Sequence, residues 1–160
     1  MRSLSLARAA VILSLAMPWS PPVHPQGQGG NVRCSIGTAP LIAFGEYDTE
    51  SNMARHTNGE LRFNCQPNKT MTVRVDIGPS GVSGSISDRR MRGSGADELG
   101  YNLFQDARGT ILWGDGVRGG VPAFVTGKDE FRVQIHGVIP ARQQVVEGLY
   151  SDSVRITILP

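Results

Sequence analysis

Apolar and polar residues alternate with a period of two at several places in this chain, and this pattern constrains the fold more than any other feature. Residues 148–160 (GLYSDSVRITILP) place Tyr150, Val154, Ile156 and Ile158 on one face and mostly polar side chains on the other. Successive side chains of a β-strand point to opposite faces, so the pattern predicts a half-buried strand. A strand at the end of the sequence predicts an open sheet edge, which either aggregates or accepts a strand from another chain.

Further strand signals recur along the chain. The clearest covers residues 71–77, where Met71, Val73, Val75 and Ile77 share one face; other segments are residues 33–36, 41–44, 60–65, 101–105, 111–113 and 129–138. Residues 78–95 are rich in Gly, Ser and Arg and are expected to form a long exposed loop, as are residues 114–120. With 20 glycines and 10 prolines dividing short apolar runs, the sequence predicts an all-β sandwich.

The first 26 residues are interpreted as a signal peptide. Arg2 and Arg8 give a basic start, residues 9–17 form an apolar run too short to span a bilayer, and residues 14–16 offer a small-residue cleavage site. Cleavage is expected between residues 16 and 26, which leaves one domain over residues 27–160.

The full chain has 16 basic and 14 acidic side chains, and loss of both leader arginines leaves equal numbers. The mature chain is therefore near neutral, and it has no stripe of basic residues interleaved with aromatic ones. Nucleic-acid binding is not expected.

The two cysteines predict one disulfide, between Cys34 and Cys65, because an even count in an exported chain indicates a bridge. The alternation of residues 60–65 directs Cys65 toward the core. Neither cysteine has a second Cys or a His at ligand spacing, so we expect no metal site.

No active site is predicted. The histidines, His24, His56 and His136, are interpreted as solvated residues, and Asp115 lacks the carboxylates and closing Glu of an EF-hand loop. Residues 151–153 (SDS) have no histidine partner that the sequence specifies, so a catalytic triad cannot be argued. We therefore expect no enzyme activity, no catalytic residue, no cofactor and no small-molecule substrate.

Several short motifs, taken together and in this order, resemble the spore coat protein U domain family, which includes the subunits of Csu-type pili. The motifs are FGEYD (residues 44–48), Cys65, DRRM (88–91), LGYNLF (99–104), WGDG (113–116), IPARQ (139–143) and GLYSDSV (148–154). The resemblance spans residues 34–160. Phe104 stands where tyrosine is usual, and Arg142 where glycine is usual.

The resemblance implies an immunoglobulin-like sandwich that lacks one strand and has one disulfide. Its implied function is that of a secreted structural subunit of a chaperone–usher pilus (a fimbrium) or a related surface or coat structure, with roles in adhesion and biofilm. The expected partners are a periplasmic chaperone, an outer-membrane usher and other pilin subunits, and the expected route is through the periplasm to the cell surface. Tyr150, Val154, Ile156 and Ile158 are expected to line the acceptor groove for a partner strand.

The segment before Cys34 is expected to be a poor donor strand. Residues 21–33 (PPVHPQGQGGNVR) contain only Val23 and Val32 as sizeable apolar residues, and proline removes a ladder donor. We therefore expect the chain to be a pilus subunit with a weak or unusual donor, a terminal subunit, or a standalone member of the family.

Two other functions remain open. The first is a secreted coat protein that needs no usher. The second is a carbohydrate-binding sandwich that uses Trp113 and Tyr101 as aromatic platforms, a role that requires both rings to be exposed.

Overall fold

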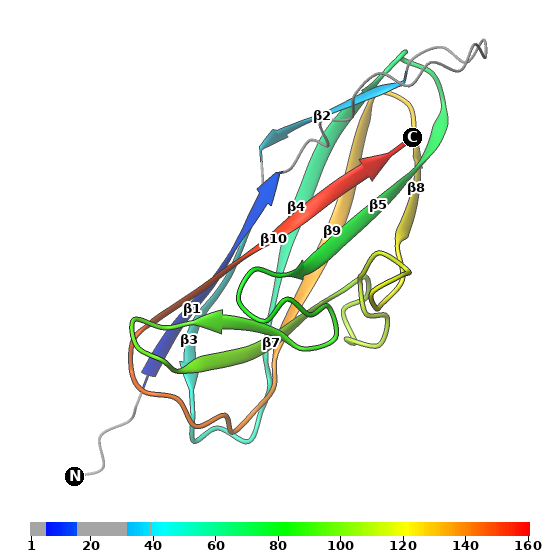
Figure 1. The fold of residues 1–160 in the computed structure, drawn as a ribbon. Coiled ribbons are helices and arrows are strands. Elements are labelled where there is room, and N and C mark those ends of the chain that lie inside the picture. Colours follow the sequence, from blue (N-terminus) through cyan, green and yellow to red (C-terminus); the bar gives the residue numbers. More distant parts are fainter. Residues whose placement is uncertain (1–5, 16–31, 39) are drawn as a thin grey trace.

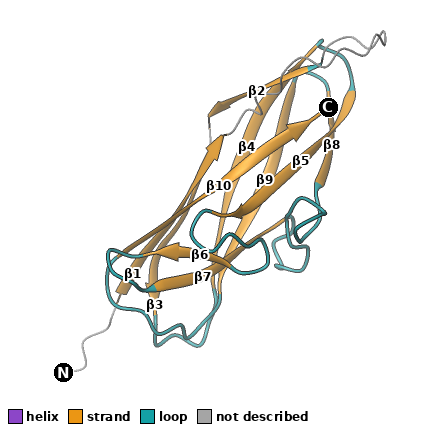
Figure 2. Cartoon of the chain, in the orientation of Figure 1, coloured by secondary structure: helices purple, strands orange, loops and turns teal. Residues whose placement is uncertain are grey.

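The structure, a computed structural model, describes residues 6–15, 32–38 and 40–160, and these form strands and loops without any helix (Figures 1 and 2). Consequently no described helix is long and apolar enough to cross a membrane. The strands are β1 (Leu6–Leu15), β2 (Arg33–Thr38), β3 (Leu41–Asp48), β4 (Arg55–Gln66), β5 (Met71–Ser80), β6 (Arg89–Arg92), β7 (Glu98–Phe104), β8 (Ala123–Gly127), β9 (Glu130–Ile139) and β10 (Leu149–Leu159).

The strands form one curled sheet with two halves. One half runs in the order β3, β1, β10, β5 and β8, and the other in the order β2, β4, β9, β7 and β6. The halves join where β6 meets β10 through the single pair Ser151 and Arg92. All pairings except the parallel β1–β10 pair are antiparallel.

The core lies between the two halves. Phe44 of β3 contacts Tyr101 of β7 edge to face, with ring centroids 5.9 Å apart. Phe63 of β4 and Phe131 of β9 stack at 4.9 Å. Apolar side chains from both halves contribute to one buried cluster, as expected for a sandwich whose inner faces alternate with outer polar ones. The all-β prediction is therefore confirmed.

The clearest predicted strands are present, and Val73, Val75 and Ile77 of β5 are fully buried. The prediction of an exposed loop over residues 78–95 is wrong in part, because β6 lies inside it. Three of the four β6 residues are arginines, which conceal the alternation, yet Arg89 and Met91 face inward and are buried.

Residues 111–113 do not form the predicted strand. The segment makes isolated bridges, from Leu112 to Phe104 and from Trp113 to Val121. The segment ends at Gly114, where two parts of the backbone pass close to each other. A Cβ on Gly114 would lie 1.8 Å from the carbonyl oxygen of Gly119. Strand β8, which follows, was not predicted from the sequence.

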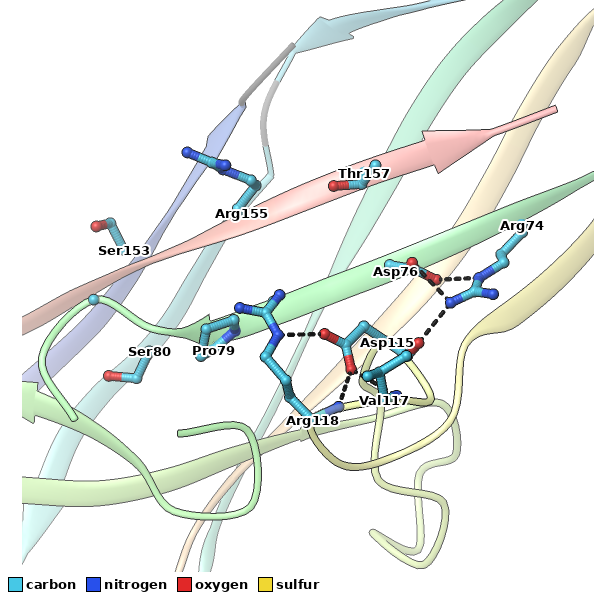
Figure 3. A pocket seen from close by; sticks show the side chains of 12 residues that line it. Arg74, Asp76, Pro79, Ser80, Asp115, Val117, Arg118, Ser153, Arg155 and Thr157 are labelled. Carbon is cyan, nitrogen blue, oxygen red and sulfur yellow. Dashed lines mark hydrogen bonds and ion pairs between the residues drawn. The ribbon is translucent and has the colours of Figure 1, made fainter. Parts of the chain in front are cut away.

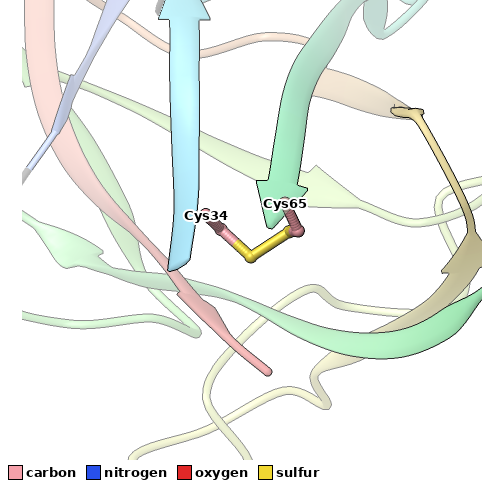
Figure 4. Close-up of a disulfide and its surroundings, with 2 residues drawn as sticks. All are labelled: Cys34 and Cys65. Carbon is pink, nitrogen blue, oxygen red and sulfur yellow. A yellow bond between two sulfur atoms is a disulfide. The ribbon is translucent and has the colours of Figure 1, made fainter. Parts of the chain in front are cut away.

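The predicted disulfide is present between Cys34 of β2 and Cys65 of β4 (Figure 4). The two residues are direct partners in the antiparallel β2–β4 register. Cys65 is buried, as the alternation predicted, and Cys34 is partly buried. β2 pairs only with β4 among the described strands, so the bridge fixes an edge strand to the sheet.

We expect removal of this bridge to destabilise the fold substantially. In the chain-entropy model, a loop of this length contributes about 3–4 kcal/mol. The double variant Cys34→Ser, Cys65→Ser should lower the free energy of unfolding by that amount in urea titrations of the full chain. Adding reductant to the unsubstituted chain should reproduce the loss and should leave the variant unchanged. Equal stability of the oxidised chain and the variant would contradict this role.

Candidate partner-strand site

Strand β1 lies between β10 and β3 (Figure 1). It pairs in parallel with β10 from Arg8 opposite Leu149 to Leu15 opposite Ile156. On its other side it pairs antiparallel with β3, from Leu6 opposite Asp48 to Ile12 opposite Leu41, with one irregularity. This segment lies within residues 1–26, the predicted signal peptide.

Within the described residues, β1 is the only backbone connection between β10 and β3. β3 has no other strand partner, and β10 pairs on its remaining side with β5 and β6. Residues 32–160 alone would therefore leave two facing strand edges without a strand between them. Unpaired backbone groups at such edges readily accept another strand.

Val11 is the described β1 residue that enters the core, and it is fully buried. Its register partners are Asp152 of β10 and Ile42 of β3, and Ile42 is also fully buried. Burying one valine side chain contributes roughly 1.5–3 kcal/mol. A strand in this position therefore adds to the core as well as to the hydrogen-bond ladder.

The four residues expected to line the acceptor groove share the inner face of β10. Tyr150, Val154 and Ile156 are buried and belong to the core cluster, and each is opposite a β1 residue. Ile158 is half-buried and lies beyond the last β1 pair, where β10 pairs with Val75 of β5. Their assignment to an acceptor groove stays a prediction.

The inner face of β10 also carries a carboxylate whose burial was not predicted from the sequence. Asp152 lies between Tyr150 and Val154 on this face and is only 5% exposed. The hydroxyl of Tyr101 donates to its Oδ2 at 2.7 Å, and the backbone N–H of Val82 donates to its Oδ1 at 3.2 Å. Burial and the neighbouring charge of Asp152 raise the pKa of Tyr101, so its phenol remains a donor. The sequence signal that could have identified Asp152 is its place at an inward position of an otherwise apolar alternation.

A second buried polar group is Arg89, which has no measurable exposure. Its guanidinium donates to the carbonyls of Gly78 and Trp113 at 2.9 Å and of Ile86 at 3.1 Å. It also donates to the carbonyl of Ile77 and the side chain of Asn102. Burial lowers the pKa of Arg89 to about 10, so the group stays charged at neutral pH. The arginine thus ties together β5, the loop before β6, β7 and the segment that contains Trp113.

Trp113 and Tyr101 are buried, at 0% and 2% exposure. The indole N–H of Trp113 donates to the carbonyl of Val75 at 2.9 Å. Neither ring can serve as an exposed platform for a sugar, so the carbohydrate-binding alternative loses its main support. The described residues contain no group of three His, Cys, Asp or Glu that could hold a metal ion.

The loop after β9 is fastened to the rest of the domain by Tyr47 and Gln143. The Tyr47 hydroxyl donates to the carbonyl of Pro140 at 2.8 Å and accepts from the N–H of Gln143 at 2.9 Å. The Gln143 amide in turn bonds the N–H and the carbonyl of Gly100 in β7. Arg142, which replaces the usual glycine, has φ of 60°, a conformation that glycine adopts without strain.

Comparisons with known proteins agree with this architecture. Residues 31–157 match the model of the Spore Coat Protein U domain family. "Protein U" of Myxococcus xanthus is 30% identical over 137 residues, which cover 78% of this chain and 76% of that protein. The chain therefore belongs to the spore coat protein U domain family.

A solved structure has the same fold at low sequence identity. It is a crystal structure of the CsuC–CsuE chaperone–tip adhesion subunit pre-assembly complex from the archaic chaperone–usher Csu pili of Acinetobacter baumannii. The TM-score is 0.58 at 15% identity, and the match covers 81% of this chain and 40% of that chain. This likeness supports the immunoglobulin-like sandwich as the fold, and this chain spans about two fifths of the solved one.

Proposed function

We propose that this chain is a secreted structural subunit of a chaperone–usher pilus, or of a related surface or coat structure, and that it assembles by donor-strand complementation. The observation that carries the proposal is the position of β1. This strand precedes the matched family domain, which begins at residue 31, yet it fills the space between β10 and β3.

In this proposal residues 1–26 direct export to the periplasm and are removed. The mature domain, residues 27–160, then lacks a strand between β10 and β3. The resulting acceptor groove is lined by Tyr150, Val154, Ile156 and Ile158. A periplasmic chaperone fills it first, and after transfer to an outer-membrane usher a strand of another subunit takes its place at the cell surface.

The proposed recognition is β-augmentation. Main-chain groups of Leu149–Leu159 and Leu41–Asp48 hydrogen-bond the incoming strand, and alternate apolar side chains of that strand fill the core. The buried position of Val11 indicates where the incoming strand needs an apolar residue. A charged residue at this position of the incoming strand would lie opposite Asp152 of β10. Burying that charge in the core is costly, so such a strand should not bind.

A synthetic peptide tests the groove. A peptide of residues 6–15 (LARAAVILSL) present while the leaderless chain, residues 27–160, is refolded should raise the yield of soluble protein, and the melting temperature of that protein should rise with peptide concentration. The matched control is the same peptide with Val11→Asp, which should give no shift. A leaderless chain that is stable alone and responds to neither peptide would contradict the proposal.

The match to the spore coat protein U domain family also favours a second candidate, a coat protein assembled without an usher. Genes for a chaperone and an usher next to the gene of this chain would support the pilus, and their absence would support the coat.

A further inference from the structure

A groove of about 640 Å³ lies on the outer face of β5 and β10 (Figure 3). We call it the β5–β10 groove and define it by Arg74, Gly78, Arg118, Ser153, Arg155 and Thr157. Side chains of β10 form one wall, and the loop that carries Asp115 and Arg118 forms the other (Figure 3). Its volume is within the range of small-ligand sites, about 300–1,000 Å³.

Gly78 of β5 lines the groove without contributing a side chain to it. A Cβ on Gly78 would lie 3.4 Å from the carbonyl oxygen of Arg155 and 3.6 Å from its Cβ. The outer face of β10 displays the hydroxyls of Ser153 and Thr157 on either side of Arg155. Ser153 is exposed and Thr157 is half-buried. Both can therefore bond a ligand.

The charges around the groove leave one arginine in excess. Arg74 pairs with Asp76 at 2.7 Å, and Arg118 pairs with Asp115 at 2.7 Å. Burial acts to raise the pKa of Asp115, but the N–H groups of Arg118 and Val117 outweigh it and hold this pKa at about 2. Each of the two carboxylates is therefore already paired with an arginine of the groove. Arg155 has no ion pair among the described residues, so the groove attracts anions.

We propose that the β5–β10 groove binds an acidic polysaccharide, with Arg155 contacting a carboxylate or sulfate and the Ser153 and Thr157 hydroxyls contacting neighbouring sugar hydroxyls. A guanidinium matches the planar geometry of these oxyanions, and charge-assisted hydrogen bonds are the stronger ones. The described lining residues include no aromatic ring on which a nucleic-acid base could stack, which favours a hydroxyl-rich anion over single-stranded nucleic acid.

Ser153 and Arg155 lie on the part of β10 that pairs with β1, opposite Ile12 and Ser14, so the sample must contain a strand in that position. The oxidised full chain is therefore the correct sample. Calorimetric titration should compare oligomers of galacturonate, heparin-derived oligosaccharides and neutral galactan of the same length. We expect one or both acidic polymers to bind and the neutral one not to bind.

The variant Arg155→Gln should weaken this binding about tenfold, as expected for loss of one charged hydrogen-bonding group. The matched control is Arg108→Gln, which removes the same charge from an exposed turn outside the groove and should leave the affinity unchanged. Binding to only one acidic polymer would identify the oxyanion. Equal weakening by both substitutions, or equal binding of neutral galactan, would overturn the proposal.

Discussion

Replacing Arg89 with methionine should lower the free energy of unfolding by about 3–5 kcal/mol, one of the two largest effects expected of a single substitution in this domain. The guanidinium is fully buried and supplies the carbonyls of Ile77, Gly78, Ile86 and Trp113 with donors. Each buried acceptor left without a donor costs roughly 1–3 kcal/mol, and methionine supplies none. Urea unfolding of the oxidised full chain measures the loss.

The neighbouring arginine provides the control. Arg90 points to the other face of β6, is partly exposed, and pairs with Asp88 at 2.9 Å. Exposed ion pairs contribute about 0–1 kcal/mol, so Arg90→Met should have little effect. Arg89→Lys should fall between the two, because a single ammonium cannot serve all the acceptors of the guanidinium. If Arg89→Met unfolds at the same urea concentration as Arg90→Met, the structural role assigned to Arg89 is wrong.

The second large effect is expected for Trp113→Ala. Large-to-small substitutions of a buried tryptophan destabilise by about 3–5 kcal/mol, because the transfer free energy is lost and a cavity remains. Trp113 is fully buried, and its loss also removes the indole donor to the Val75 carbonyl. Thermal or urea unfolding of the oxidised full chain gives the measurement.

Two further variants serve as comparisons. One separates the packing of the Trp113 ring from its hydrogen bond, and the other tests whether loss of any aromatic side chain is destabilising. Trp113→Phe keeps a ring but removes the N–H donor, and should cost less than Trp113→Ala. Phe124→Ala, at a side chain that is 68% exposed on β8, should change stability little. If Trp113→Ala keeps its stability but loses affinity for a neutral sugar, the structural role of Trp113 is wrong and the residue is a sugar-binding platform.

Where alternation is regular, the sequence predicted the strand and the direction of its side chains. The inward faces of Glu60–Cys65 and of Tyr150–Ile156 appear as expected, since period-two apolar residues must share the buried face. The disulfide followed from the cysteine count. The motif residues that suggested the family, such as Tyr47, Trp113 and Gln143, prove to be buried or hydrogen-bonded structural contacts.

Polar residues in the core could not be predicted in the same way. Arg89 and Asp152 carry charges that usually face water, and their partners are backbone groups or a tyrosine distant in sequence. Only the folded chain brings these groups together. The place of Leu6–Leu15 in the sheet was likewise not expected, because its apolar run was explained fully as part of an export signal.

The most direct test is to express the gene in a bacterial periplasm with and without its cognate chaperone and to record native and denaturing mass spectra of the purified product. We expect a mature amino terminus created by cleavage between residues 16 and 26, and a soluble protein recovered only as a one-to-one complex with the chaperone. A cleaved chain that is soluble, monomeric and stable without the chaperone would show that the sandwich is complete on its own, and would contradict the account.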